Sequence, residues 1–155
     1  LKTLCPLLVL CLGVEALLLL GHQQNGFLVV AFLYFLVETF DSFAYLIGRF
    51  FGSHKAFPQL SPGKTWEGYA GGFLFALAGG VGFNLLVFKW GWTEFTMTWG
   101  VALIAGISGD LITSWYKRKN NRKDFDPLIS LHGGILDIYD SLLFGAIALA
   151  AMYFV

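Results

Sequence analysis

The chain has 155 residues, of which 57% are hydrophobic and only 13% are charged. A soluble domain usually has about a quarter charged residues, and a chain of this length has too small an interior to bury so much apolar surface. The composition therefore excludes a water-soluble monomer. Ten basic and ten acidic residues give a formal net charge of zero, which excludes a polybasic arm that binds nucleic acid.

Five apolar runs are long enough to cross a bilayer as helices, each of which needs about 20 residues. They cover roughly residues 3–20, 26–48, 68–88, 97–116 and 134–155. No stretch alternates with the period of two that is typical of membrane β-barrels. The sequence therefore predicts an all-α, polytopic integral membrane helical bundle with about five transmembrane helices, forming a single domain over residues 1–155. Position 1 is Leu rather than Met, so we expect the full protein to have a further N-terminal part.

The basic residues predict the orientation of these spans. If the spans alternate in direction, nine of the ten basic residues lie on one side of the membrane and only Lys89 lies on the other. The positive-inside rule assigns the basic side to the cytoplasm. The two long loops, 49–68 and 117–134, share that side, so we expect any chemistry that they carry to be cytoplasmic.

Small residues within the spans are expected to serve packing. One row has a spacing of four, which places its members on one helical face and lets helices approach closely in lipid. The row consists of Gly68, Gly72, Ala76 and Gly80. Cys5 and Cys11 lie on different faces of the first span, so we expect small core residues rather than a disulfide or a metal pair.

Acidic residues in the spans are the first candidates for function, because an ionisable group inside a bilayer costs at least ~2.5–3.5 kcal/mol. Asp137 and Asp140 are three residues apart near the start of the last span, and Asp110, Ser114 and Lys117 share a face near the end of the fourth. Mg²⁺ is typically held by one or two carboxylates, while substrate phosphates and water complete its shell. The pattern thus indicates a Mg²⁺–phosphate site. Structural ion pairs with the neighbouring Lys and Arg residues are an equally supported alternative.

Two loop segments supply groups that complement these acids. In segment 61–68, a Pro-Gly turn exposes backbone N–H groups, Lys64 adds a positive charge, and Ser61 and Thr65 add hydroxyls. A capped helix start, with Thr65 as the N-cap, explains the same residues. Before the last span, His132 is followed by Gly133 and Gly134, which would let a phosphate or a base approach the backbone closely.

Together these residues resemble the phosphatidate cytidylyltransferase family, whose closing motif they follow with every spacing preserved. That motif is represented by Ser114, Lys117, Arg118, Lys123, Asp124, His132, Gly133, Gly134, Asp137 and Asp140. Upstream, the run from Asp41 to Tyr45, followed by Gly48, Arg49 and Gly52, and the block 61–68 are also similar to the family. Three positions differ from its usual pattern: Ile138 replaces a basic residue, Ser130-Leu131 replaces Pro-Gly, and Asp126 replaces a small residue.

The resemblance implies a catalytic domain that transfers CMP from CTP to phosphatidic acid, giving CDP-diacylglycerol and pyrophosphate. It also implies Mg²⁺ as cofactor, K⁺ as a second cation, a homodimer in the lipid bilayer, and a location in the bacterial inner membrane with the active site facing the cytoplasm. By position, Asp110, Asp137 and Asp140 would be catalytic and bind metal, and Lys117 would be catalytic. Substrate binding would fall to Asp41, Ser61, Lys64, Thr65, Ser114, Arg118, Lys123, Asp124, His132, Gly133 and Gly134.

Such a reaction fits a chain that has abundant acids and bases and no nucleophile motif. A phosphate monoester is already anionic at neutral pH, because its second pKa is about 6, so no dedicated general base is required. Two other functions remain open on the sequence. One is a CTP-dependent kinase of a lipid alcohol such as a polyprenol, which would need a base. The other is a non-catalytic membrane scaffold or transporter of the same fold.

Overall fold

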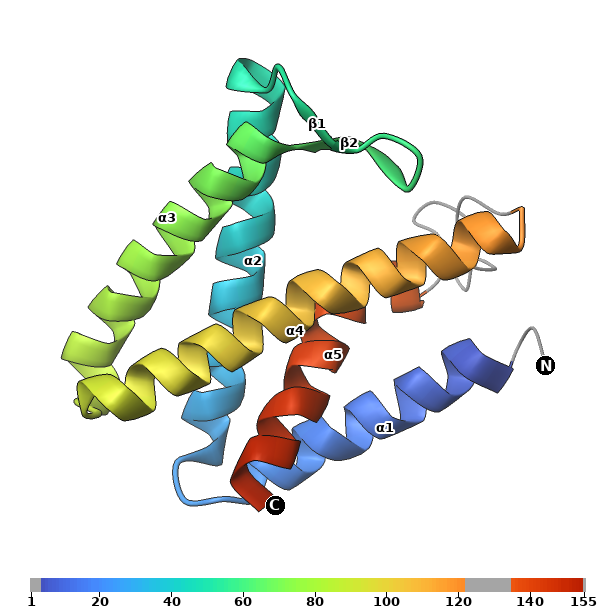
Figure 1. Cartoon of the computed structure of the whole chain (residues 1–155). Coiled ribbons are helices and arrows are strands. Elements are labelled where there is room, and N and C mark those ends of the chain that lie inside the picture. The colour runs from blue at the N-terminus through green and yellow to red at the C-terminus, as the bar shows by residue number, and fades with distance from the viewer. Residues whose placement is uncertain (1–3, 122–134, 155) are drawn as a thin grey trace. The chain divides into compact units, whose positions relative to one another are not determined.

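The computed structural model describes residues 4–121 and 135–154, which are mainly helical (Figure 1). In chain order the elements are α1 (Leu4–Gly21), α2 (Gly26–Phe51), β1 (Lys55–Phe57), β2 (Ser61–Thr65), α3 (Trp66–Phe83), the π-helical turn η1 (Asn84–Phe88), α4 (Trp92–Lys119) and α5 (Ile135–Phe154).

Four helical segments are long and apolar enough to cross a membrane. They are Gly26–Phe51, Trp66–Phe88, Trp92–Lys119 and Leu136–Phe154, and the apolar helix Cys5–Gly21 is shorter. The prediction of an all-α, polytopic integral membrane protein is therefore confirmed. The helix α4 begins at Trp92, before the predicted span at residue 97, because helical hydrogen bonding already starts there: the backbone N–H of Phe95 donates to the carbonyl oxygen of Gly91 at 3.0 Å.

The chain forms two compact units, one within Leu1–Val30 and Val101–Val155 and the other within Ala31–Gly100. In the first unit α1 packs against α5 at Gly13, where an added Cβ would lie 2.6 Å from a methyl carbon of Leu143. Cys5 and Cys11 are free and exposed, so the expectation that they are core residues is wrong. The face of α1 that packs on α5 instead includes Gly13, because only a residue without a side chain fits against Leu143.

In the second unit α2 and α3 pack closely through glycines. A Cβ added at Gly68 would lie 2.5 Å from the carbonyl oxygen of Ala44, and one at Gly72 would lie 2.7 Å from that of Phe40. One helical turn further along α3, Phe75 stacks on Phe43 with ring centroids 3.8 Å apart. The predicted row of small residues is buried throughout, which confirms its packing role; the buried members are Gly68, Gly72, Ala76 and Gly80.

A small antiparallel ribbon connects α2 to α3 in a segment that the sequence predicted only as a loop. Lys55 pairs with Thr65 and Phe57 with Ser61. The strands are too short to show the alternation of polar and apolar residues on which strand prediction depends. Thr65 then begins α3 as its N-cap, because its hydroxyl accepts a hydrogen bond of 3.1 Å from the backbone N–H of Gly68. The capped helix start, one of the two interpretations of this segment, is thus what the structure contains.

The other end of α3 closes with a π-helical turn that the sequence did not predict. Lys89 ends the turn with a left-handed backbone conformation, at a φ of 56°. The side chain of Asn84 then holds the backbone of Trp90, accepting a hydrogen bond from its N–H at 3.1 Å and donating one to its carbonyl oxygen at 3.3 Å. Asn84 is buried, so this pairing satisfies a polar side chain that would otherwise face apolar neighbours.

The glycine contacts between α2 and α3 predict a difference between two alanine substitutions in the same helix. Gly68→Ala should destabilise the protein by about 1–3 kcal/mol, because the new methyl group meets the Ala44 carbonyl and cannot move aside. Gly82→Ala is the matched control, since, apart from its own stretch of helix, no described atom lies within 4 Å of a Cβ built at that position. Thermal unfolding in detergent should show a lower midpoint for Gly68→Ala alone. Equal midpoints for the two variants would contradict the close packing.

Candidate functional site

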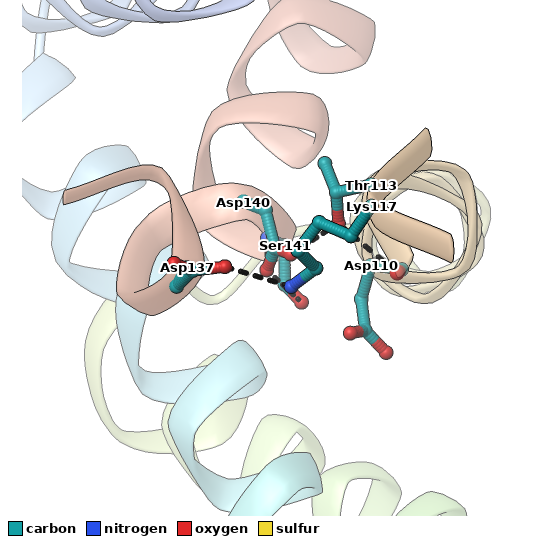
Figure 2. A network of polar contacts seen from close by, with 6 residues as sticks. All are labelled: Asp110, Thr113, Lys117, Asp137, Asp140 and Ser141. Atoms are coloured by element: carbon teal, nitrogen blue, oxygen red, sulfur yellow. Dashed lines mark hydrogen bonds and ion pairs between the residues drawn. The ribbon is translucent and has the colours of Figure 1, made fainter. Parts of the chain in front are cut away.

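An ion pair connects the end of α4 to the start of α5 (Figure 2). The Nζ atom of Lys117 lies 2.7 Å from Oδ1 of Asp137, and the two side chains are only 12% and 11% exposed. Both residues belong to the first unit, so their contact lies within one compact part of the chain. Because water is largely excluded, each charge depends on the other for neutralisation. Lys117 is therefore the ion-pair partner of Asp137, as the second interpretation of these acids predicted.

Asp140 lies one turn further along α5 and is nearly fully buried, at 5% exposure. Its Oδ2 atom accepts a hydrogen bond from the hydroxyl of Thr113, and its Oδ1 atom accepts one of 2.7 Å from the backbone N–H of Ser141. The Thr113 hydroxyl also lies 3.0 Å from the carbonyl oxygen of Asp110, in the preceding turn of α4. The carboxylate of Asp140 is thus fixed in orientation by both helices.

The carboxylate of Asp110 points away from the Lys117–Asp137 pair in the close-up view (Figure 2). In the described part of the chain, no three His, Cys, Asp or Glu side chains are grouped closely enough to hold a metal ion. A cage made entirely of protein ligands is therefore absent among residues 4–121 and 135–154. The donors that are present are aspartate oxygens on neighbouring turns of α4 and α5, which suit a cation that takes only one or two carboxylates from the protein.

The residues predicted from segment 61–68 lie in the second unit, where they surround the start of α3. Lys64 is half-buried on β2, with its Nζ atom 5.8 Å from the ring centroid of Tyr69. Thr65 is buried, and its side chain is enclosed by glycines: a Cβ added at Gly52 would lie 2.6 Å from the Thr65 hydroxyl oxygen. Ser61 is half-buried at the other end of β2. The Thr65 hydroxyl is thus committed to the helix cap.

A hydrogen-bonded contact between His54 and Glu67 closes the ribbon onto α3. The Nδ1 atom of His54 lies 2.6 Å from Oε1 of Glu67, and the backbone N–H of His54 donates to the same carboxylate at 3.2 Å. The backbone N–H of Trp66 donates in turn to the carbonyl oxygen of His54 at 3.0 Å. Glu67 therefore holds both ends of the ribbon together, and this orients the strand that carries Lys64.

The remaining predicted site residues fall into three groups. Ser114 is buried in α4, whereas Arg118 in the last turn of that helix and Asp41 in α2 are exposed. Five others lie outside the described residues: Lys123, Asp124, His132, Gly133 and Gly134. Of the predicted set, the structure brings Asp137 together with Lys117, and Asp140 together with the backbone of Asp110.

Two side-chain contacts were not predicted from the sequence, one in each compact unit of the chain. Thr113, and not Ser114, donates a hydrogen bond to Asp140. Thr113 lies three residues after Asp110 and four before Lys117, so helical periodicity places it on the same face as those two residues. His54 and Glu67 are 13 residues apart, and nothing in their local sequence indicated that a two-stranded ribbon would bring them into contact. The first omission could have been avoided by helical periodicity, whereas the second could not.

The near burial of the Lys117–Asp137 pair predicts strong coupling between its members. Lys117→Met or Asp137→Asn alone should destabilise the protein by about 3–5 kcal/mol, because each leaves the opposite group without its partner. The double variant should recover a large part of that loss. Thermal unfolding of the four proteins without nucleotide measures the coupling. Lys119→Met, at an exposed lysine of the same turn, is the control and should lose less than about 1 kcal/mol; additive effects at the paired sites would contradict the coupling.

Comparison with known proteins agrees with the resemblance that the sequence motifs indicated. The model of the cytidylyltransferase family matches residues 1–155. The chain is 38% identical over 151 residues to the phosphatidate cytidylyltransferase of Brucella abortus biovar 1 (strain 9-941), covering 88% of the chain and 56% of that protein. Enzymes of the same name are 39% identical in Haemophilus influenzae, over 76% of the chain and 43% of the relative, and 35% identical in Staphylococcus aureus (strain COL), over 90% and 54%.

The chain thus spans about half the length of the curated relatives that it matches. The match nevertheless includes every described element, from α1 to α5. The chain belongs to the cytidylyltransferase family.

Proposed function

We propose that this chain is part of an enzyme that transfers CMP from CTP to phosphatidic acid, forming CDP-diacylglycerol and releasing pyrophosphate. The observation that carries the proposal is the Lys117–Asp137 pair, which stands beside the fixed carboxylate of Asp140 on two apolar helices of a cytidylyltransferase-family chain. Buried acids and a buried base in membrane-spanning helices are costly, and they are retained where a charged substrate has to be bound.

The reaction itself requires neutralisation of charge more than proton transfer. The phosphate of phosphatidic acid is already anionic at neutral pH and attacks the α-phosphorus of CTP, while the bond from that phosphorus to the pyrophosphate oxygen breaks. Two anions must meet, and negative charge accumulates on the leaving pyrophosphate. Fixed positive groups lower this barrier, because they are already oriented when the charge develops. No Ser–His–Asp arrangement is needed for such a transfer.

Lys117 is suited to bind a phosphate oxygen at this position. Its ammonium group has three donors, and its contact with Asp137 leaves the group held in place at low exposure. When an anionic substrate enters, Lys117 is able to donate to it while Asp137 holds the other side of the ammonium. The Thr113 hydroxyl and the backbone N–H of Ser141 fix the Asp140 carboxylate, so both of its oxygens keep a constant position.

Mg²⁺ fits the donor set of this site. Asp110 and Asp137 would hold it, with Asp140 helping, and phosphate oxygens and water would be the other ligands. The bound ion would neutralise charge on the transferring phosphates. K⁺ as a second cation, and assembly as a homodimer, belong to the same proposal and rest on the family resemblance alone.

The site is proposed to face the cytoplasm of a bacterial inner membrane. The distribution of basic residues supports this orientation, since nine of ten lie on the side of the loops that carry the motif. CTP would approach from that side, where Asp41, Ser61, Lys64 and the residues of the loop 117–134 are proposed to contact the substrates. Thr65 would contribute through the cap of α3, which orients the strand bearing Lys64.

The proposal predicts that Asp137 is indispensable for turnover. In the full-length enzyme, Asp137→Asn should lower CTP-dependent conversion of phosphatidic acid at least about a hundredfold, because the carboxylate that fixes Lys117 and would hold Mg²⁺ is lost. Glu94→Gln, at an exposed acid in the first turn of α4, should retain the activity of the unmodified enzyme. Thermal unfolding of the same samples separates loss of catalysis from loss of the fold.

The mass of the lipid product distinguishes the alternatives. A CDP-lipid and pyrophosphate support the proposed transfer, whereas a phospholipid and CDP would identify a CTP-dependent kinase. Absence of both Mg–CTP binding and turnover in the full-length protein would identify a non-catalytic member of the fold. Near-normal transfer by Asp137→Asn would contradict the role given to the α4–α5 network.

Removal of divalent cations tests the proposed metal dependence. Chelation with EDTA should abolish conversion, and added Mg²⁺ should restore it. In Asp110→Asn we expect the Mg²⁺ concentration that gives half-maximal rate to rise at least about tenfold, since a carboxylate ligand has been removed. A rate that is unchanged by chelation, or an Asp110→Asn variant with the Mg²⁺ requirement of the unmodified enzyme, would contradict the proposed ligand set.

A further inference from the structure

A row of contacts joins α4 to α5 within the first unit of the chain. The ion pair described above lies nearest to the start of α5. One turn away, the side chain of Thr113 points toward Asp140 and bonds to it (Figure 2). A further turn away, the ring of Phe144 leaves no room for a Cβ at Gly109. Thr113 is therefore the middle contact of this interface, between a charged contact and close packing.

The hydroxyl of Thr113 has two acceptors within reach. Its oxygen lies 3.0 Å from the carbonyl oxygen of Asp110 in the same helix, and it also bonds to Oδ2 of Asp140 on α5. A hydroxyl has one proton to donate. The carbonyl of Asp110 lies inside α4, where the helix supplies an N–H from the residue four positions later. The buried carboxylate of Asp140 therefore has the greater need of this proton, because a buried charge without donors is costly.

Packing does not explain a hydroxyl at this position. Thr113 is only 4% exposed, and a valine of the same branched shape would fill the space without burying a polar group. Thr96, near the start of α4, is exposed and shows what a helical threonine ordinarily does. Its hydroxyl lies 2.8 Å from the carbonyl oxygen of Trp92 and 3.1 Å from that of Thr93, both in its own helix. Thr113 differs from it by having an acceptor on the neighbouring helix.

The bond from Thr113 relates Asp140 to α4. Asp140 is also held within α5, since the backbone N–H of Ser141 donates to its Oδ1 atom at 2.7 Å. That bond moves with α5, so it does not set the position of the carboxylate relative to α4. The donor on α4 does, and it lies three residues after Asp110. The orientation of Asp140 relative to Asp110 thus depends on the Thr113 hydroxyl.

We propose that Thr113 is a positioning residue for Mg²⁺, whose hydroxyl orients the Asp140 carboxylate so that Asp140 and Asp110 serve the same ion. The inference rests on the Mg²⁺ site of the proposed function, which names the aspartates but not what sets their relative orientation. Thr113 itself would contact neither the metal nor a substrate. Loss of a hydrogen bond to a metal-ligating carboxylate typically weakens metal binding by about ten- to a hundredfold.

Substitutions that separate the hydroxyl from the shape of Thr113 test this role in the full-length enzyme. Thr113→Val removes the donor and keeps the shape, whereas Thr113→Ser keeps the donor. Thr96→Val is the matched control, because it removes a hydroxyl whose bonds lie within α4. The probe is Mg²⁺ alone, titrated at constant ionic strength without CTP or lipid, and the readout is the rise of the thermal unfolding midpoint with Mg²⁺ concentration. A second measurement is the KM for CTP at saturating Mg²⁺.

We expect the Mg²⁺ concentration that gives half of the midpoint rise to increase at least about tenfold in Thr113→Val. Thr113→Ser and Thr96→Val should match the unmodified enzyme. The KM for CTP at saturating Mg²⁺ should be unchanged in all three variants, since Thr113 does not contact the nucleotide. A residue that only supports the fold would instead lower the midpoint without Mg²⁺ and leave the Mg²⁺ dependence as it is.

Two results would overturn the inference and leave the proposed function intact. One is a Thr113→Val variant with the Mg²⁺ dependence of the unmodified enzyme. The other is a Thr113→Ser variant that behaves like Thr113→Val, because the methyl group rather than the hydroxyl would then be responsible. If Thr113→Val does not fold, Thr113→Ala removes the same hydroxyl without placing a methyl group against Asp140. An unmodified enzyme whose midpoint does not respond to Mg²⁺ would overturn both the inference and the proposed Mg²⁺ site.

Discussion

The neutralisation of charge within apolar helices is the constraint on which the rest of this structure depends. Lys117 and Asp137 lie on helices that are apolar enough to span a membrane, and they are held 2.7 Å apart with little access to water. Asp140 is satisfied by Thr113 and by the backbone of Ser141. A low dielectric makes each unpaired charge costly, so these contacts determine how α4 and α5 meet. The same contacts form the network at which we propose that an anionic substrate binds.

Close packing without side chains has the corresponding role in the second unit. Glycines of α3 contact the backbone carbonyls of α2 at Ala44 and Phe40, where any added methyl group would collide. This approach places the Thr65 cap between the two helices and leads directly into the ribbon that carries Lys64. Small residues thus bring the helices together in lipid, where van der Waals contact rather than the hydrophobic effect favours association. The packing of α2 against α3 therefore holds both ends of the ribbon in place.

Much of the fold and part of the candidate site could be predicted from the pattern of residues. Long apolar runs indicate spans directly, and helical periodicity placed Asp137 and Asp140 on one face. Periodicity alone could not show that Asp137 has an ion-pair partner, because that depends on how closely Lys117 of another helix approaches it. The π-helical turn at Asn84 and the exposure of Cys5 and Cys11 also escaped prediction, since both depend on neighbours distant in the sequence or on which helix face is covered.

The sequence by itself determined that the chain is an all-α membrane protein, that its charges gather near one end of the spans, and that its motifs resemble those of cytidylyltransferases. These properties follow from composition and spacing, which need no knowledge of neighbours. Only the tertiary structure decided that Thr113 rather than Ser114 holds Asp140, and that Glu67 ties His54 to α3. Those outcomes depend on which helix face meets which neighbour, and packing rather than local sequence determines this.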